Sequence, residues 1–350
     1  MRAAAPELGT AALAALIERG DHWRSGAVPG AGDPHHEWSH FVVFAPGVDL
    51  LVNFSRFAAS SERPCSQLTL LARTADGRWR GDVERHPESD VRMPGGRVEA
   101  DVGPSQLRFR NGVYELRAVL RDREIEARLR LRPQSRPALT SSVSLRPGFA
   151  MWFAVPRLEA EGEVRIGSRR IAFRGAPAYH DRDWGRFHWG GDHAWEWAVA
   201  LPADLACPWS LVVQQISDRA RHHFLSKGML VWRNGLYWRT LHHRALEIAA
   251  SGLRPAAGAL RVPRIMDLVS PGRAADVPER IDVVAHEGDD RVEGEIRVQD
   301  LVQICVPNDR DLGTTVISEA RAQACFEGRV RGEHLQLEGP AILELNRAEA

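Results

Sequence analysis

Apolar and polar residues alternate through most of this 350-residue sequence, and this alternation is the strongest constraint on its fold. In the stretch 124–132, EIEARLRLR, every second residue from 125 to 131 is apolar and the others are charged, which is typical of a half-buried β-strand. Asn111-Gly112 and Asn234-Gly235 separate further stretches of this kind, and Asn-Gly is the strongest short signal of a β-hairpin. The pattern predicts an all-β protein.

The number of predicted strands exceeds what one small barrel holds. We predict strands at 40–45, 48–54, 67–72, 107–120 (two strands), 124–132, 149–155, 163–166, 170–173, 194–201, 209–216, 229–232, 236–241, 280–284, 291–298, 314–321, 324–330 and 335–343, and one short amphipathic helix at 6–19. About twenty strands with frequent turn signals favour two antiparallel barrels or sandwiches. We therefore predict an N-terminal helix and linker (1–24) and two β-domains (25–190 and 191–350).

Composition narrows the function classes. The formal net charge is zero, which argues against nucleic acid as the main partner. Four scattered cysteines without a CxxC pair suggest a reducing compartment and no zinc site, and no apolar run approaches the length of a membrane span. There is no P-loop and no GxSxG motif. We expect a cytoplasmic protein without metal or cofactor, and we leave open a peripheral contact with a membrane surface.

The stretch 178–185, AYHDRDWG, gathers the residues best suited to chemistry. On a strand, Tyr179, Asp181 and Asp183 would share one face, and His180, Arg182 and Trp184 the other. A carboxyl group buried among aromatic rings has a raised pKa and keeps a proton near neutral pH. Two interpretations stay open here: an acid site, or structural ion pairs between the aspartates and nearby arginines.

The same stretch resembles the carotenoid 1,2-hydratase family, whose relatives include hydroxyneurosporene synthases and AttH-like proteins. The family pattern is Tyr-His-Asp-His-Asn-Trp-Gly, and residues 179–185 here read YHDRDWG. The stretches 152–156 (WFAVP) and 195–197 (WEW) are also similar to the family, and 36–38 (HEW) is loosely similar to its opening motif. The resemblance implies two lipocalin-like β-domains and a hydrophobic isoprenoid substrate.

The resemblance also implies roles for individual residues. The family's aspartate is the acid that protonates an isoprenoid double bond, which corresponds to Asp181, with Tyr179 beside it and Trp152 nearby. Ala150 stands at the position of a family histidine. We predict substrate contacts from one group of residues, and a structural role at the domain junction for a second group. The first comprises Trp38, Trp152, His180, Trp195 and Trp197; the second comprises Arg182, Asp183, Trp184 and Gly185.

Several functions remain open on the sequence alone. The first is a cofactor-independent hydratase or cyclase that protonates an isoprenoid or polyene double bond, with tryptophan faces stabilising the cation. The second is a lipocalin-like carrier that binds an apolar ligand without chemistry. A third is a pericyclic cyclase that depends on cavity shape, and a fourth is a carbohydrate-active protein with Asp181 and Asp183 as its two carboxyl groups.

Overall fold

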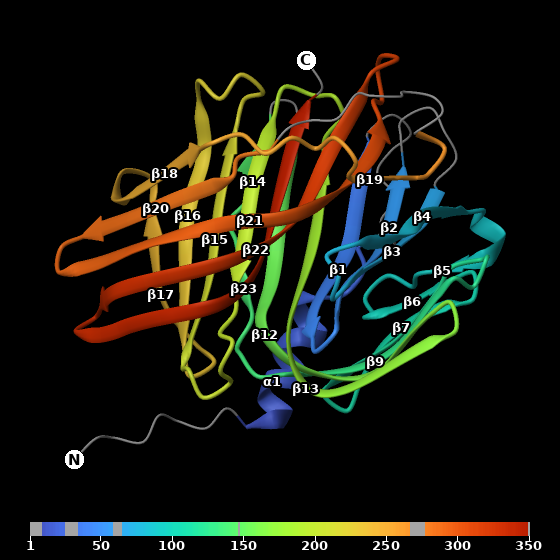
Figure 1. Cartoon of the computed structure of the whole chain (residues 1–350), viewed down its shortest axis with the longest axis horizontal. Helices are drawn as coiled ribbons and strands as arrows, with labels where there is room; N and C mark the ends of the chain where they lie inside the picture. Colours follow the sequence, from blue (N-terminus) through green and yellow to red (C-terminus); the bar gives the residue numbers. More distant parts are fainter. Residues whose placement is uncertain (1–8, 25–33, 59–64, 146–147, 267–276, 349–350) are drawn as a thin grey trace.

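The computed structural model describes residues 9–24, 34–58, 65–145, 148–266 and 277–348, and these form two large β-sheets and one α-helix (Figure 1). This confirms the predicted all-β, two-domain class. Pairing is antiparallel throughout the two main strand paths, and the short β19 pairs in parallel with β21.

The first sheet has the strand order β4-β3-β2-β1-β13-β12-β9-β8-β7-β6-β5, with β10 and β11 beside β12. Its strands are β1 (His35–Ala45), β2 (Val48–Ala58), β3 (Cys65–Thr74), β4 (Trp79–His86), β5 (Val91–Arg92), β6 (Glu99–Val102), β7 (Ser105–Arg110), β8 (Val113–Val119), β9 (Ile125–Pro133), β10 (Ala138–Leu139), β11 (Val143–Ser144), β12 (Phe149–Ile166) and β13 (Arg169–Arg186). A 3₁₀ turn, Glu88–Asp90, precedes β5.

The second sheet has the order β17-β16-β15-β14-β23-β22-β21-β20-β18. Its strands are β14 (Ala194–Ala200), β15 (Trp209–Ser217), β16 (Phe224–Arg233), β17 (Leu236–His242), β18 (Leu246–Ser251), β19 (Leu260–Val262), β20 (Arg280–Glu287), β21 (Asp290–Pro307), β22 (Thr314–Val330) and β23 (Glu333–Ala348), with a 3₁₀ turn at His243–Ala245. The strands pass from one sheet to the other between Arg186 and Ala194, and the predicted domain boundary at 190/191 falls in this connection.

Both Asn-Gly turns occur where the sequence predicted hairpins. Asn111 and Gly112 have φ values of 52° and 74°, and Asn234 and Gly235 have 52° and 72°. Positive φ at both central residues is what a tight two-residue hairpin of type I′ requires. These turns join β7 to β8 and β16 to β17.

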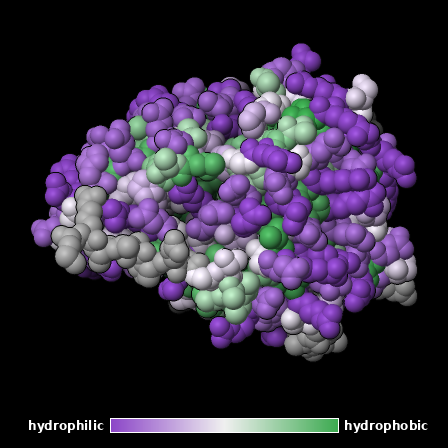
Figure 2. Space-filling model, turned by 90° about the horizontal axis from the view of Figure 1, so that it is seen from below, coloured by the Kyte–Doolittle hydropathy of each residue, from purple (hydrophilic) through white to green (hydrophobic). Residues whose placement is uncertain are grey.

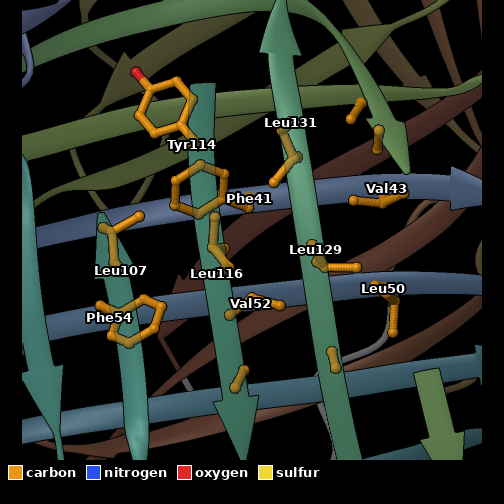
Figure 3. Close-up of a cluster of buried hydrophobic side chains, with 14 of the residues drawn as sticks. Phe41, Val43, Leu50, Val52, Phe54, Leu107, Tyr114, Leu116, Leu129 and Leu131 are labelled. Atoms are coloured by element: carbon orange, nitrogen blue, oxygen red, sulfur yellow. The ribbon is translucent and has the colours of Figure 1, made fainter. Parts of the chain in front are cut away.

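Strands crossing at a steep angle enclose the core of the first sheet (Figure 3). Side chains of β1 and β2 pack against those of β7, β8 and β9 in this core, as is typical of a sheet that curls onto itself. Helix α1 (Thr10–Gly20) adds Leu13 and Ile17 to the same core. The helix was predicted at 6–19, of which residues 6–8 lie outside the described residues.

A second core lies inside the second sheet, and a third lies between the two sheets. The third core joins Trp152 of β12, Tyr179 of β13, Trp197 of β14 and Ile342 of β23. Figure 1 shows these four strands near the middle of the molecule. The faces of the two sheets that meet here carry the residues discussed below.

The sequence pattern predicted two separate strands where the structure has the single strand β12. The predicted strands 149–155 and 163–166 belong to one strand, Phe149–Ile166. Its pairing with β13 shifts register between Val155 and Leu158 and again between Ala160 and Gly162. Each such irregularity inserts residues and changes the phase of the alternation, so the sequence there no longer looks like a strand.

The face of the molecule shown in Figure 2 is mainly hydrophilic, with small hydrophobic patches. Within the described residues, no helix has the length and apolar character needed to cross a membrane.

Candidate active site

Strand β13 places its alternate residues in two different environments. Tyr179, Asp181 and Asp183 face the second sheet, whereas His180 and Arg182 point to the interior of the first. This is the division that the period of a β-strand predicts. Neighbouring β1 pairs His40 with Asp181, and Trp38 with Asp183, so these two side chains join the same face.

The carboxyl group of Asp181 is held by two donors on one oxygen. The Trp152 indole Nε1 donates to Asp181 Oδ2 at 3.1 Å, and the Tyr179 hydroxyl donates to the same atom at 2.8 Å. No donor within the described residues reaches the other oxygen, Oδ1. The carboxyl group therefore has a fixed orientation, with Oδ1 as the oxygen that can carry a proton.

A cavity of about 80 Å³ opens beside Asp181, between the two sheets. The four tryptophans predicted to contact substrate line it together with Asp181, Asp183 and Glu344: Trp38, Trp152, Trp195 and Trp197. Further lining comes from Thr140, Ala150, Trp184, Phe187, Glu196, Gln214, Gln215 and other neighbours. The structure thus brings together the predicted acid and all four tryptophans predicted to contact substrate.

Burial determines the protonation states of the side chains on the cavity face of β13. It raises the pKa of Asp181 to about 7, although the hydrogen bonds from Trp152 and Tyr179 act in the opposite direction. Burial, together with the nearby Asp181, also raises the pKa of the Tyr179 hydroxyl well above its ordinary value, so the phenol stays a donor. Burial and the carboxyl groups of Asp181 and Glu344 raise the pKa of Asp183 well above its ordinary value. The site can hold a neutral carboxylic acid near neutral pH.

Because Asp181 is costly to ionise in the folded protein, we expect Asp181→Asn to stabilise it. The native state keeps the proton up to about pH 7, whereas the unfolded chain releases it near 3.8. Wild-type stability should therefore fall as pH rises between these values and level off above them. We expect Asp181→Asn to be more stable by roughly 2–4 kcal/mol above pH 7, with little advantage near pH 4. Urea unfolding across this pH range measures the difference, and an advantage that does not change with pH would contradict it.

The opposite face of β13 forms a buried network with the end of the N-terminal helix. Asp21 accepts hydrogen bonds from Tyr114 Oη at 2.7 Å and Arg182 Nε at 2.7 Å, and its Oδ2 lies 2.8 Å from His180 Nε2. The guanidinium of Arg182 also lies 4.0 Å from the ring centroid of Trp23. His180, which we predicted to contact substrate, therefore does not line the cavity. Arg182 lies within the first sheet rather than between the sheets.

Gly185, predicted to be structural, lies where its strand meets β12 closely. A Cβ atom at this position would lie 2.2 Å from the backbone oxygen of Phe149. Since both sides of the contact are backbone, the strands would have to separate. We expect Gly185→Ala to lower the free energy of unfolding by about 1–3 kcal/mol, as measured by urea unfolding. Gly167→Ala is the control. A Cβ atom at Gly167 would meet no other atom within 4 Å, so this variant tests the cost of a positive φ alone. Equal losses in the two variants would show that the contact with Phe149 is unimportant.

Sequence reasoning missed three titratable groups on the cavity side: the buried His40 and Glu319 and the half-buried Glu344. One ligand-type atom from each lies within 4.8 Å of the others. Glu344 interrupts the apolar run 341–345, AILEL, and a lone carboxyl in such a strand is a usable signal. His40 and Glu319 carry no comparable signal, because their partners lie far away in the sequence.

No family model matches the sequence, and no curated protein matches it. Solved structures do match its fold. A structure described as an AttH from Nitrosomonas europaea superposes with a TM-score of 0.67 at 14% identity, over 93% of this chain and 97% of that one. Kievitone hydratase from Nectria haematococca gives 0.59 at 12% identity, over 89% and 88%. CghA solved with Sch210972 gives 0.53 at 14% identity, over 91% and 89%. The chain is similar to these proteins in fold along nearly its whole length.

Proposed function

We propose that this protein is a hydratase or cyclase that protonates a carbon–carbon double bond of a hydrophobic isoprenoid or polyene. The observation that carries the proposal is the placement of Asp181. Its carboxyl group borders a tryptophan-lined cavity, its Oδ2 is fixed by Trp152 and Tyr179, and its Oδ1 has no donor within the described residues. A neutral carboxylic acid in this position can deliver the proton on Oδ1 to a substrate in the cavity.

The protons balance in the proposed reaction: one proton passes from Asp181 to carbon, and one is recovered. The O–H bond of Asp181 breaks, its proton forms a C–H bond with one alkene carbon, and the other carbon becomes a cation. The proton that Asp181 has lost is then replaced by one from a water molecule that adds to the cation or from a carbon next to it after ring closure. Hydration and cyclisation thus share the first step, and both regenerate the acid.

The aromatic side chains that line the cavity can stabilise the cationic intermediate. Trp152 and Trp197 lie edge to face with ring centroids 6.4 Å apart, and the Tyr179 and Trp197 centroids are 5.0 Å apart. An indole face can stabilise a nearby cation by about 0.5–2 kcal/mol. The position of the cavity between the two sheets also limits the access of bulk water, which would otherwise trap the cation unselectively.

The fold similarity to kievitone hydratase supports a reaction of this type. Incubating the protein in D2O with a panel of terpenoid and polyene compounds tests the proposal. Deuterium on carbon in a product, with the mass of one added water, would identify a hydratase, and deuterium without added water would identify a cyclase. A compound that binds and is recovered unchanged would instead indicate a carrier.

A product without deuterium would point to a pericyclic reaction that depends on the shape of the cavity. In that case Asp181→Asn should leave the rate nearly unchanged, because no proton is transferred to carbon.

A further inference from the structure

Two glutamates of the second sheet lie next to one another at the edge of the cavity. Glu319 of β22 and Glu344 of β23 are paired residues in the register of the two strands, and Trp197 of β14 is paired with Glu344 on its other side. Directly paired side chains have Cβ atoms about 4.5–5.5 Å apart, and two like charges in this position repel. Glu319 is buried, and Glu344 opens onto the cavity beside Asp181.

Within the part of the chain that the structure describes, no cationic side chain balances these carboxyl groups. Neither Glu319, Glu344, Asp181 nor Asp183 forms an ion pair with an arginine or lysine among the described residues. The one basic side chain in the group is His40, and burial lowers its pKa to about 3, which leaves it neutral. Four carboxyl groups this close together and largely removed from solvent cannot all be ionised.

Donors in the group are also fewer than acceptors. The Trp195 indole donates to Glu344, and the two glutamate carboxyl groups are within hydrogen-bonding reach of one another. Glu319 Oε2 and His40 Nε2 are buried without a hydrogen-bond partner in the described structure. A proton between the two glutamates removes their repulsion and supplies the missing donor.

We propose that Glu319 and Glu344 share one proton and act as a proton store: the pair returns a proton to Asp181 after the first step, and the proton released by the added water or by the neighbouring carbon refills it. The proposal rests on the proposed function of Asp181 and adds two residues to it. Since His40 is the residue paired with Asp181 on β1, the store adjoins the acid through contiguous side chains. Glu344 is the member that both borders the cavity and contacts Glu319, so we assign it the position next to Asp181.

The electrostatics of the group support this arrangement. Burial raises the pKa of Glu319 well above its ordinary value, and Glu344 adds to the effect. Burial likewise raises the pKa of Glu344. The charge on Glu344 in turn raises the pKa of Asp181. Other titratable groups also lie near Asp181. Tyr179 and Asp183 are on its own strand, His40 is on β1, and Glu196 of β14 lines the same cavity, while His180 on the opposite face of β13 acts to lower the pKa of Asp181. The coupled carboxyl groups therefore titrate as a unit.

Infrared spectroscopy tests the shared proton without any substrate. We would record the carbonyl stretch of protonated carboxyl groups in H2O and D2O for wild type, Glu319→Gln and Glu344→Gln, with Glu338→Gln as the control on an exposed position of the same strand. We expect each of the two buried variants to lose a protonated-carboxyl band present at neutral pH, and Glu338→Gln to lose none. Bands of ionised carboxylates in place of protonated ones would overturn the proposal.

A bound metal ion is the second result that would overturn it, since His40, Glu319 and Glu344 are close enough to hold one. Elemental analysis of the purified wild type should show no stoichiometric divalent metal. One equivalent that is lost in His40→Ala would assign the cluster to a metal ion instead of a proton.

The pH dependence separates a proton store from a merely structural pair. Removing the Glu344 charge should lower the pKa of Asp181, so the protonated-Asp181 band, and the alkaline limb of any activity profile, should move to lower pH in Glu344→Gln. With an active substrate, we expect the steady-state turnover of Glu344→Gln to fall about 10-fold. Its first turnover should be retained, because Asp181 still holds a proton at the start of the reaction. An unshifted titration would overturn the store. An active Asp181→Asn would overturn the proposed function while leaving the infrared result on the glutamates unchanged.

Discussion

Asp181→Asn should lose proton transfer to carbon, with turnover reduced by about 10²–10⁴-fold. Asparagine keeps the shape of the side chain and can still accept from Trp152 and Tyr179, but it has no acidic proton. Tyr179→Phe should reduce turnover less, because Trp152 still holds Oδ2. Steady-state rates with an active substrate measure both effects.

The control for this comparison is Asp289→Asn, the same chemical change at an exposed position outside the cavity. It should leave turnover unchanged. Because Asp181→Asn is also expected to stabilise the fold, an inactive variant that unfolds more easily than wild type would contradict the explanation, since its inactivity would then reflect damage to the structure.

Asp21→Asn should cause the largest loss of stability, about 3–5 kcal/mol. Asp21 is completely buried and is the hydrogen-bonded partner of both Arg182 and His180. Without its charge, the guanidinium of Arg182 keeps Glu37, at 3.5 Å, as its one remaining carboxylate among the described residues. Urea unfolding at neutral pH measures the change in the free energy of unfolding.

Glu18→Ala, at an exposed position on the preceding helix, should change stability by less than about 0.5 kcal/mol. A double variant, Asp21→Asn with Arg182→Met, should recover part of the loss, because it removes the uncompensated charge. A double variant less stable than Asp21→Asn alone would show that Arg182 stabilises the fold mainly through Trp23 and Glu37.

The same network explains a departure of this sequence from the motif that it resembles. Arginine stands at position 182 where the family pattern has histidine, and its partner Asp21 lies 161 residues away along the chain. Alternation correctly predicted that Arg182 and Asp181 face opposite ways. It could not reveal the partner, because Asp21 lies in the short turn after the helix and carries no periodic signal.

The residues around the cavity were also only partly predictable from the sequence pattern. The predicted residues on β12, β13 and β14 come together because each lies on a strongly patterned strand, and strand period decides the face. Glu319 and Glu344 reach the site through pairing between β14, β23 and β22, which is set by sheet order and register. Nothing local in the sequence specifies that order. His180 shows the converse, since its position in the motif suggested a substrate contact that its strand face does not permit.

The position of the deuterium atom is the most direct test of the acid assigned to Asp181. A substrate converted in D2O by wild type and by Asp181→Asn would be analysed by NMR and mass spectrometry. We expect wild type to place one deuterium on a single carbon and face of the product, and the variant to place none. Equal labelling by both proteins, or labelling on both faces of the carbon, would contradict a proton delivered from the fixed carboxyl group of Asp181.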